Sequence, residues 1–144
     1  VRRTPEHGEY HARIMEDPKR FNFTAPEEAR ADRELVLAAV SANGLVLELA
    51  TRALREDREV VLRAVQSNGQ ALQHAGAKLR GDREVILEAL RSDGLALCHA
   101  ASAAVDRDIV LAAVSQNGWA LRHVPEQLRD DRRIVLTAVA QRGR

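Results

Sequence analysis

Hydrophobic and polar positions recur along this chain with a spacing of 24 or 25 residues. Each occurrence opens with an aspartate, continues through a mainly apolar stretch and closes with a glycine twelve residues later, as in DREVVLRAVQSNG at 57–69. The opening aspartates are Asp32, Asp57, Asp82, Asp106 and Asp131, and the closing glycines are Gly44, Gly69, Gly94, Gly118 and Gly143. A fixed period of this kind predicts tandem structural repeats.

Both ends of a short helix are marked within each occurrence. An aspartate side chain can accept hydrogen bonds from the first free backbone N–H groups, so we expect a helix N-cap at each opening aspartate. An acid follows in the first turn of four copies, where negative charge favours the helix dipole. The Asn-Gly or Asp-Gly pair at the other end is typical of a left-handed C-cap, formed here by Gly44, Gly69, Gly94 and Gly118. We call this helix of each copy helix A.

The faces of helix A follow from the positions that vary. Ala38, Arg63, Glu88, Ala112 and Thr137 are equivalent and share no chemistry, so they predict a solvent-exposed stripe. Most other positions stay apolar, as in Val60, Val61 and Val65 of the second copy. An apolar arc this wide indicates a helix that packs against neighbours on several sides.

A second apolar pattern follows each glycine: LVLELA, QALQHA, LALCHA and WALRHV. We interpret it as a short helix B that ends near Val124 in the fourth copy. A turn comes next, clearest as PEQLRD at 125–130, where Pro125 suits the first position of a helical turn. The third copy is one residue shorter in this turn, around 101–105.

Helices this short are marginal alone in water, and stacked copies would bury their shared apolar faces. We therefore predict an all-α protein, a right-handed α-solenoid of two-helix repeats of about 25 residues. The expected repeats are 32–56, 57–81, 82–105, 106–130 and a half-repeat at 131–144. Residues 1–31 form a non-repeat segment with a capping helix at 10–16 and a degenerate half-repeat, because PEEARAD at 26–32 echoes PEQLRDD at 125–131.

The two ends of the array supply candidate interaction residues. Three of the four aromatic residues, Tyr10, Phe21 and Phe23, lie in the N-terminal segment. At the other end, the fifth copy stops after helix A, so we expect Val135 and Val139 to lack part of their cover. Either the chain continues or a protein partner covers that end. Trp119 occupies the position that Gln70 takes in another copy, so this position is not deep in the core. An interface role and local packing are equally open for Trp119.

Composition narrows the class of protein. Hydrophobic residues make up 45% and charged residues 30%, and the formal net charge is only +1, so no overall charge attracts nucleic acid or anionic membranes. No apolar run approaches the roughly 18 residues that a membrane span needs. The single cysteine, Cys98, excludes an internal disulfide and favours a reducing compartment. We expect an intracellular location, cytoplasmic or organellar (chloroplast or mitochondrial). Because residue 1 is Val, we also expect a processed product or a fragment.

The recurring pattern D-R-E-V-V-L-x-A-V-x-x-N-G-x-A-L-x-x-A resembles a family of short helical repeats, the domain of unknown function 4116. DREVVLRAVQSNGQALQHA at 57–75 carries the resemblance most clearly, and it extends over about 26–144. The resemblance implies an all-helical repeat fold and no established activity, so it supplies no catalytic residues. One departure is the histidine at 74, 99 and 123, where an aromatic such as tyrosine is expected about as often.

The histidines offer two candidate metal sites, and neither is favoured. His74, His99 and His123 are equivalent, but packed helices lie about 8–10 Å apart, too far for a shared zinc ion with bonds of about 2.0–2.1 Å. Leu49 fills the same slot in the first copy, which favours packing. His7 and His11 are four residues apart, and HGEYH is not a zinc-protease pattern, so we expect a surface pair. No metal or cofactor is predicted.

A series of arginines beside the opening aspartates has two readings. These are Arg33, Arg58, Arg83, Arg107 and Arg132. They could form an anion-tracking stripe for nucleic acid, or they could pair with acids in the same or the neighbouring copy. We favour the second reading because acids flank most of them and few aromatics lie nearby for base stacking.

No sequence motif supports catalysis, and we predict no catalytic residues. Cys98 occupies an exposed slot with nothing nearby to activate it. The leading hypothesis is a non-enzymatic scaffold for protein–protein interaction, as a subunit of a larger intracellular or organellar complex. Its candidate contact residues are Trp119, Tyr10, Phe21, Phe23, Val135 and Val139. The alternative is a nucleic-acid-binding repeat protein that uses the arginine series.

Overall fold

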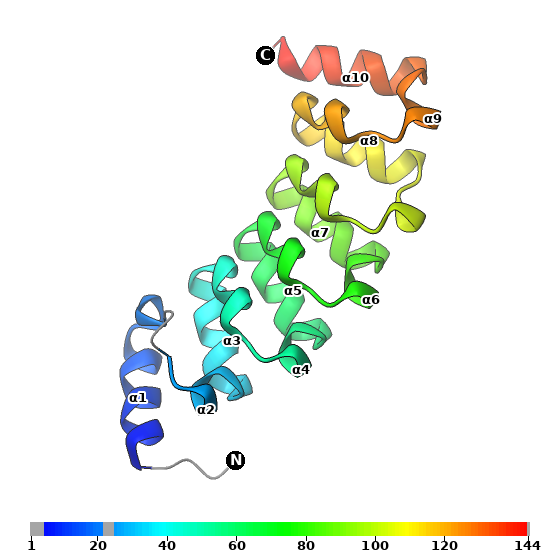
Figure 1. The fold of residues 1–144 in the computed structure, drawn as a ribbon. Coiled ribbons are helices and arrows are strands. Elements are labelled where there is room, and N and C mark those ends of the chain that lie inside the picture. Colours follow the sequence, from blue (N-terminus) through cyan, green and yellow to red (C-terminus); the bar gives the residue numbers. More distant parts are fainter. Residues whose placement is uncertain (1–4, 22–24, 144) are drawn as a thin grey trace.

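The computed structural model describes residues 5–21 and 25–143, and every regular element in those ranges is a helix. The prediction of an all-α protein is therefore confirmed. Helix α1 (Pro5–Glu16) lies at the N-terminal end, and the longer helices of the repeats follow it in chain order as a stack toward the C-terminal end (Figure 1). Phe23 lies outside the described residues.

Helix A of each repeat is an α-helix of 10 or 11 residues. The five are α3 (Arg33–Ala42), α5 (Arg58–Ser67), α7 (Arg83–Ser92), α8 (Arg107–Gln116) and α10 (Arg132–Arg142). Each begins directly after its aspartate, whose side chain accepts a hydrogen bond from a first-turn N–H group. In α5, Asp57 accepts from Glu59 N at 3.1 Å and from Val60 N at 3.3 Å, so one carboxylate oxygen serves two otherwise unpaired donors.

Helix B is a 3₁₀ helix rather than an α-helix. The four copies are η2 (Gly44–Leu49), η3 (Gly69–His74), η4 (Gly94–His99) and η6 (Gly118–His123). The residue before each glycine is extended, and its side chain caps the 3₁₀ helix. In η3, for example, Asn68 Oδ1 accepts from Gln70 N at 2.9 Å. Six residues with apolar positions close together do not distinguish the two helix types, which is why the sequence pattern was ambiguous.

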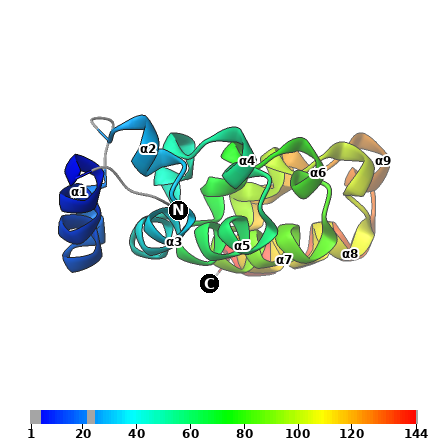
Figure 2. The ribbon, with the colours of Figure 1, turned by 90° about the horizontal axis from the view of Figure 1, so that it is seen from below.

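The predicted turn that precedes each helix A contains a further helical turn. The one-turn helices are α2 (Glu27–Arg30), α4 (Arg52–Arg55), α6 (Ala77–Arg80) and α9 (Glu126–Arg129), and the shortened third copy has the 3₁₀ turn η5 (Ser102–Ala104) instead. Seen from below, the one-turn helices form one layer and the longer helices another (Figure 2). The short 3₁₀ helix η1 (Pro18–Arg20) follows α1.

A continuous apolar core runs through the stack of longer helices. In each helix A the residues three, four and seven positions after the aspartate face inward, as Val60, Val61 and Ala64 do in α5, where all three are fully buried. Leu72 of η3 and Leu79 of α6 extend the same core from the second and third elements of the repeat. Each repeat thus buries its apolar surface both within itself and against its neighbours.

The glycines that follow helix A do not form left-handed C-caps, and this prediction is wrong. No described residue has a positive φ. Gly69 is instead the first residue of η3, and a Cβ atom there would overlap the carbonyl oxygen of Ala89 in the next repeat. A Cβ atom at Gly44, Gly94 or Gly118 would overlap the carbonyl oxygen of Ala64, Ala113 or Ala138 in the same way. Glycine is required because two backbones meet, not because the chain turns left-handed.

The same close approach allows a hydrogen bond between repeats. The backbone N–H of Gly69 donates to Ser92 Oγ at 3.0 Å. A serine or a glutamine in the next helix A accepts the equivalent bond in the other copies. These pairs are Gly44–Ser67 at 3.1 Å, Gly94–Gln116 at 2.8 Å and Gly118–Gln141 at 2.6 Å. Consecutive repeats are therefore joined by polar bonds as well as by apolar packing.

The N-terminal segment packs onto the first repeat. Helix α1 contacts α3, and Phe21 is only 2% exposed, with its ring edge-on to Tyr10 at a centroid distance of 6.5 Å. Phe21 is therefore a core residue and not an interaction side chain, which corrects the expectation for it. Tyr10 is half-buried against the same core. A large aromatic ring in a short segment gains more by packing inward than by remaining in water.

Candidate protein-interaction site

Each interface between consecutive repeats contains an arginine–carboxylate ion pair. Arg33 Nε lies 2.9 Å from Asp57 Oδ2, and Arg33 Nη2 lies 2.5 Å from Glu59 Oε2. Arg58 pairs with Asp82 and Glu84, Arg83 with Asp106 and Asp108, and Arg107 with Asp131. We call these ion pairs, which four arginines form at four interfaces, the arginine ladder. The arginine always belongs to one repeat and the carboxylates to the next.

The arginine ladder affects the ionisation of both partners. The hydrogen bond from Arg33 lowers the pKa of Asp57, and the hydrogen bond from Arg107 lowers the pKa of Asp131. The Asp57 and Glu59 carboxylates in turn raise the pKa of Arg33. These arginines are engaged by acids of the neighbouring repeat, the second of the two readings of the arginine series. They are roughly half exposed, so each pair adds little stability alone.

At the N-terminal end, two histidines of α1 occupy the position that the arginine of the preceding repeat takes at the other interfaces. His7 Nε2 lies 3.1 Å from Asp32 Oδ2, and both side chains are only 2% exposed. His11 Nε2 lies 3.6 Å from Glu34 Oε1. His7 is thus buried, which corrects its assignment to a surface pair. Because α1 contacts the first carboxylate pair of the array, it covers that end of the stack.

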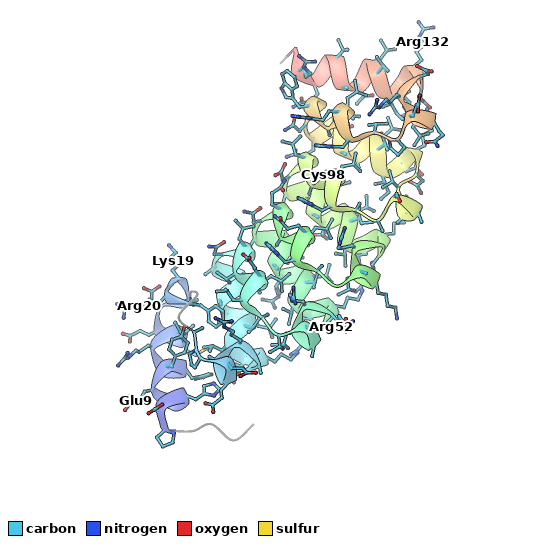
Figure 3. The ribbon with its side chains drawn as sticks, in the orientation of Figure 1. Glu9, Lys19, Arg20, Arg52, Cys98 and Arg132 are labelled. Carbon is cyan, nitrogen blue, oxygen red and sulfur yellow. The ribbon has the colours of Figure 1, made fainter. Side chains whose placement is uncertain are left out.

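At the C-terminal end, the last arginine of the series has no such partner. Arg132 pairs with no carboxylate in the part of the chain that the structure describes, and it points away from the stack (Figure 3). On the same side of α10, Leu136 is 56% exposed and Val139 is 59% exposed. We call Arg132, Leu136 and Val139 the α10 face.

Comparison with the other repeats shows how unusual this exposure is. The residues equivalent to Val139 are Val40, Val65, Leu90 and Val114, which are at most 1% exposed. The residues equivalent to Leu136 are Leu37, Leu62, Leu87 and Leu111, which all pack against the core. Val135, the other residue predicted at this end, is half-buried. The sequence predicts Val139 at this end, but its pattern does not indicate that Arg132 shares the same face.

Trp119 lies at the edge of the fourth repeat rather than on the α10 face. Its side chain is 57% exposed, and the guanidinium of Arg142 lies 3.7 Å from the ring centroid. In the second repeat the equivalent Gln70 donates to Asp93 Oδ2 of the third repeat at 2.8 Å. Trp119 thus replaces a polar contact between repeats by a cation–π contact. Its outer ring surface stays accessible.

The equivalent histidines lie in separate repeats. No group of three or more His, Cys, Asp or Glu side chains suited to a metal ion occurs among residues 5–21 and 25–143. His99 Nε2 lies 2.8 Å from Gln70 Oε1, and burial lowers the pKa of His74, His99 and His123. Cys98 is exposed, and partial burial of its thiol raises its pKa, which makes it a weaker nucleophile.

A cavity of about 840 Å³ between the first and second repeats is lined by five basic side chains and by the carboxylates of Glu56 and Asp82. The basic side chains are Arg52, Arg55, Arg58, His74 and Lys78. Arg52 pairs with Glu56, and Arg58 belongs to the arginine ladder. Arg55 and Lys78 form no ion pair with an acid of residues 5–21 or 25–143, so they supply the remaining positive charge. This cavity was not predicted from the sequence. The signal was the arginine two positions before the opening aspartate, at 30, 55, 80 and 129.

Short helices joined by a repeated arginine ladder, with the same hydrogen bond at each glycine, define a tandem helical-repeat protein. The chain belongs to the family described as Domain of unknown function (DUF4116), which matches residues 32–80, 57–102 and 106–144. No curated protein and no solved structure matches it. None of the helices in the described ranges has the length and apolar character to cross a membrane.

Proposed function

We propose that this chain is a non-enzymatic helical-repeat scaffold, a right-handed α-solenoid that binds protein partners as a subunit of a larger intracellular or organellar complex. The observation that carries the proposal is the α10 face. Val139 is 59% exposed, whereas its four equivalents are at most 1% exposed. Aliphatic side chains that every other repeat buries are available here for a partner.

The energetics of the α10 face favour docking. Burying a Leu or Val side chain fully is worth about 1.5–3 kcal/mol relative to exposure, and this face presents one of each. Arg132 adds a planar donor that fits a carboxylate. A small apolar centre beside a charged group is a common arrangement at protein interfaces.

Site-specific photocrosslinking tests the proposal. A photoactivatable amino acid at position 136 should link the chain to one partner protein in its native source. The matched control places the same amino acid at position 63, which lies in the solvent-exposed stripe of helix A. A stoichiometric adduct from position 136 and none from position 63 is expected. Equal labelling of many proteins from both positions would contradict the proposal.

Nucleic-acid binding is the second candidate function. The arginine ladder is occupied by carboxylates, so the basic cavity supports this candidate better. It predicts RNA binding that weakens as salt rises and that falls when Arg55 and Lys78 are both replaced by Gln. Replacing Arg63 by Gln is the control, because Arg63 is exposed and does not line the cavity. No retention on RNA at low salt would exclude it.

A further inference from the structure

The cavity between the first and second repeats has the size of a small-molecule site. Its volume of about 840 Å³ lies within the range of about 300–1,000 Å³ that is typical of ligand pockets. Helices α4 and α6, which are neighbours in the layer of one-turn helices, supply much of its lining (Figure 2). Ala75 and Leu79 add buried apolar side chains to that lining. The cavity therefore has room for a molecule larger than a single ion, with an apolar part.

The charges of the lining leave an excess of two cations. Each of its two carboxylates, Glu56 and Asp82, pairs with an arginine of the same lining. Arg55 and Lys78 are the two cations that remain. Burial lowers the pKa of His74, so this imidazole is mainly neutral at pH 7. A phosphate monoester carries a charge of about −1.5 to −2 at that pH, which matches the excess with opposite sign.

The side chain of Arg55 differs from its equivalents in its hydrogen bonding. In Arg30, Arg80 and Arg129, Nε donates to a backbone carbonyl oxygen at 3.1, 3.0 and 2.9 Å, respectively. Arg55 Nε is buried and has no hydrogen-bond partner among the described residues. A buried N–H group without an acceptor is unfavourable. A phosphate held by Nε and one Nη supplies that acceptor once the guanidinium turns toward the cavity.

The combination of this arginine with a lysine occurs at one interface of the array. Ala53 and Gln127 occupy the position of Lys78 in the first and fourth repeats, and the shortened third copy has no lysine at 101–105. The backbone contact across the cavity is a hydrogen bond from Gly76 N–H to the Arg55 carbonyl oxygen at 2.9 Å. Equivalent backbone bonds join other repeats, so the side chains are what distinguish this cavity.

We propose that this cavity binds a small phosphomonoester. Arg55 holds two oxygen atoms of the phosphate group, Lys78 neutralises its remaining charge, and the organic part lies along Ala75 and Leu79. One phosphate group suits the site better than a nucleic-acid strand, because a strand carries a phosphate at every nucleotide and the arginine ladder is already occupied by carboxylates. The inference is independent of the scaffold function.

Titration of the full chain followed by NMR spectroscopy tests this inference. The probes are inorganic phosphate, phenyl phosphate and a single-stranded oligoribonucleotide, each added at constant pH and ionic strength. His74 lines the cavity, so the signals of its ring report occupancy. We expect saturable shifts of these signals with both phosphates. Phenyl phosphate should bind more tightly than inorganic phosphate, because its ring buries apolar surface in the cavity.

Two variants locate the binding in the cavity. Arg55→Gln combined with Lys78→Gln should weaken the binding of phenyl phosphate by about tenfold or more, through the loss of charge-assisted contacts. The matched control, Lys19→Gln combined with Arg63→Gln, removes the same two charges at exposed positions outside the lining and should leave the affinity unchanged. Ala77→Glu removes no packed side chain, places a carboxylate in the lining at an exposed position and should also weaken binding.

Four results would overturn the inference. The first is the absence of a saturable shift of the His74 signals with either phosphate at millimolar concentrations. The second is equal weakening by the two double variants, which would assign the binding to overall charge. The third is inorganic phosphate binding at least as tightly as phenyl phosphate. The fourth is binding of the oligoribonucleotide through Arg55 and Lys78 without binding of phenyl phosphate, which would favour the nucleic-acid candidate instead.

Discussion

Arg33 of the first repeat donates through Nε to Asp57 of the second at 2.9 Å, and the same Asp57 side chain caps helix α5. One carboxylate therefore both starts a helix and joins it to the preceding repeat. The same double use recurs where Arg58 meets Asp82 and where Arg107 meets Asp131. This shared residue explains why the Asp-Arg pair recurs in every copy.

Substitutions at Asp57 separate its two contributions. Asp57→Ala removes both the cap and the ion pair and should lower the free energy of unfolding by about 1–2 kcal/mol. Asp57→Asn keeps an N-cap acceptor and loses only the charge, so it should cost less than half as much because the ion pair is exposed. Urea denaturation measures both. If Asn proves as destabilising as Ala, the ion pair rather than the cap is the dominant contribution.

Gly69 should tolerate no side chain. Gly69→Ala places a Cβ against the carbonyl oxygen of Ala89 and should cost about 1–3 kcal/mol through forced separation of the repeats. Gly81→Ala is the matched control, because its Cβ would have only ordinary contacts and its φ of −101° suits alanine. That change should be neutral or stabilising by up to about 1 kcal/mol. Similar losses at both positions in thermal unfolding would contradict the close approach.

Equivalent valines should respond differently in the isolated chain. Val65→Ala empties a fully buried position and should cost about 2 kcal/mol or more. Val139→Ala changes a side chain that is 59% exposed and should cost less than half of that. Denaturant titration of both variants checks the difference. Equal costs would show that the α10 face is covered in the isolated chain, for instance by self-association.

The histidines predict a pH dependence of stability. Burial lowers the pKa of His74, His99 and His123 below 6.5, so below that pH the unfolded chain binds more protons than the folded chain. The free energy of unfolding should therefore be fully present above about pH 6.5 and fall as the pH drops below it. Leu49 occupies the equivalent position in the first repeat, so this position accepts leucine. Replacing all three histidines by Leu should reduce the change in the free energy of unfolding between pH 7.5 and 5.5. An unchanged pH dependence in that variant would show that these three histidines are not its source.

The sequence predicted those features that depend on residues close together in the chain. The helix starting at Asp57 was readable because a cap, a first-turn acid and apolar spacing all agree over a few residues. The role of Gly69 could not be predicted in this way. An Asn-Gly pair has the same local sequence whether the glycine adopts a left-handed conformation or meets Ala89 of the next repeat. The 3₁₀ form of helix B and the burial of Phe21 also depend on packing partners far away in the sequence.

The candidate site was predictable only in part, for the same reason. The exposed position of Val139 follows from where the repeat pattern stops, and the sequence placed it at that end. The partnerless state of Arg132 appears only when the other arginines are seen to reach the following repeat. The basic cavity around Arg55 joins two repeats, so its lining is brought together by the stack and not by any one motif.

The most direct test of the scaffold function is the mass of the species that contains this chain after gentle recovery from its native source. The account predicts a complex of fixed stoichiometry with a partner protein. Val139→Glu on the α10 face should dissolve that complex, whereas Arg63→Glu in the solvent-exposed stripe should leave it intact. Recovery of the wild-type chain as a monomer, or a complex that both variants leave unchanged, would contradict the account.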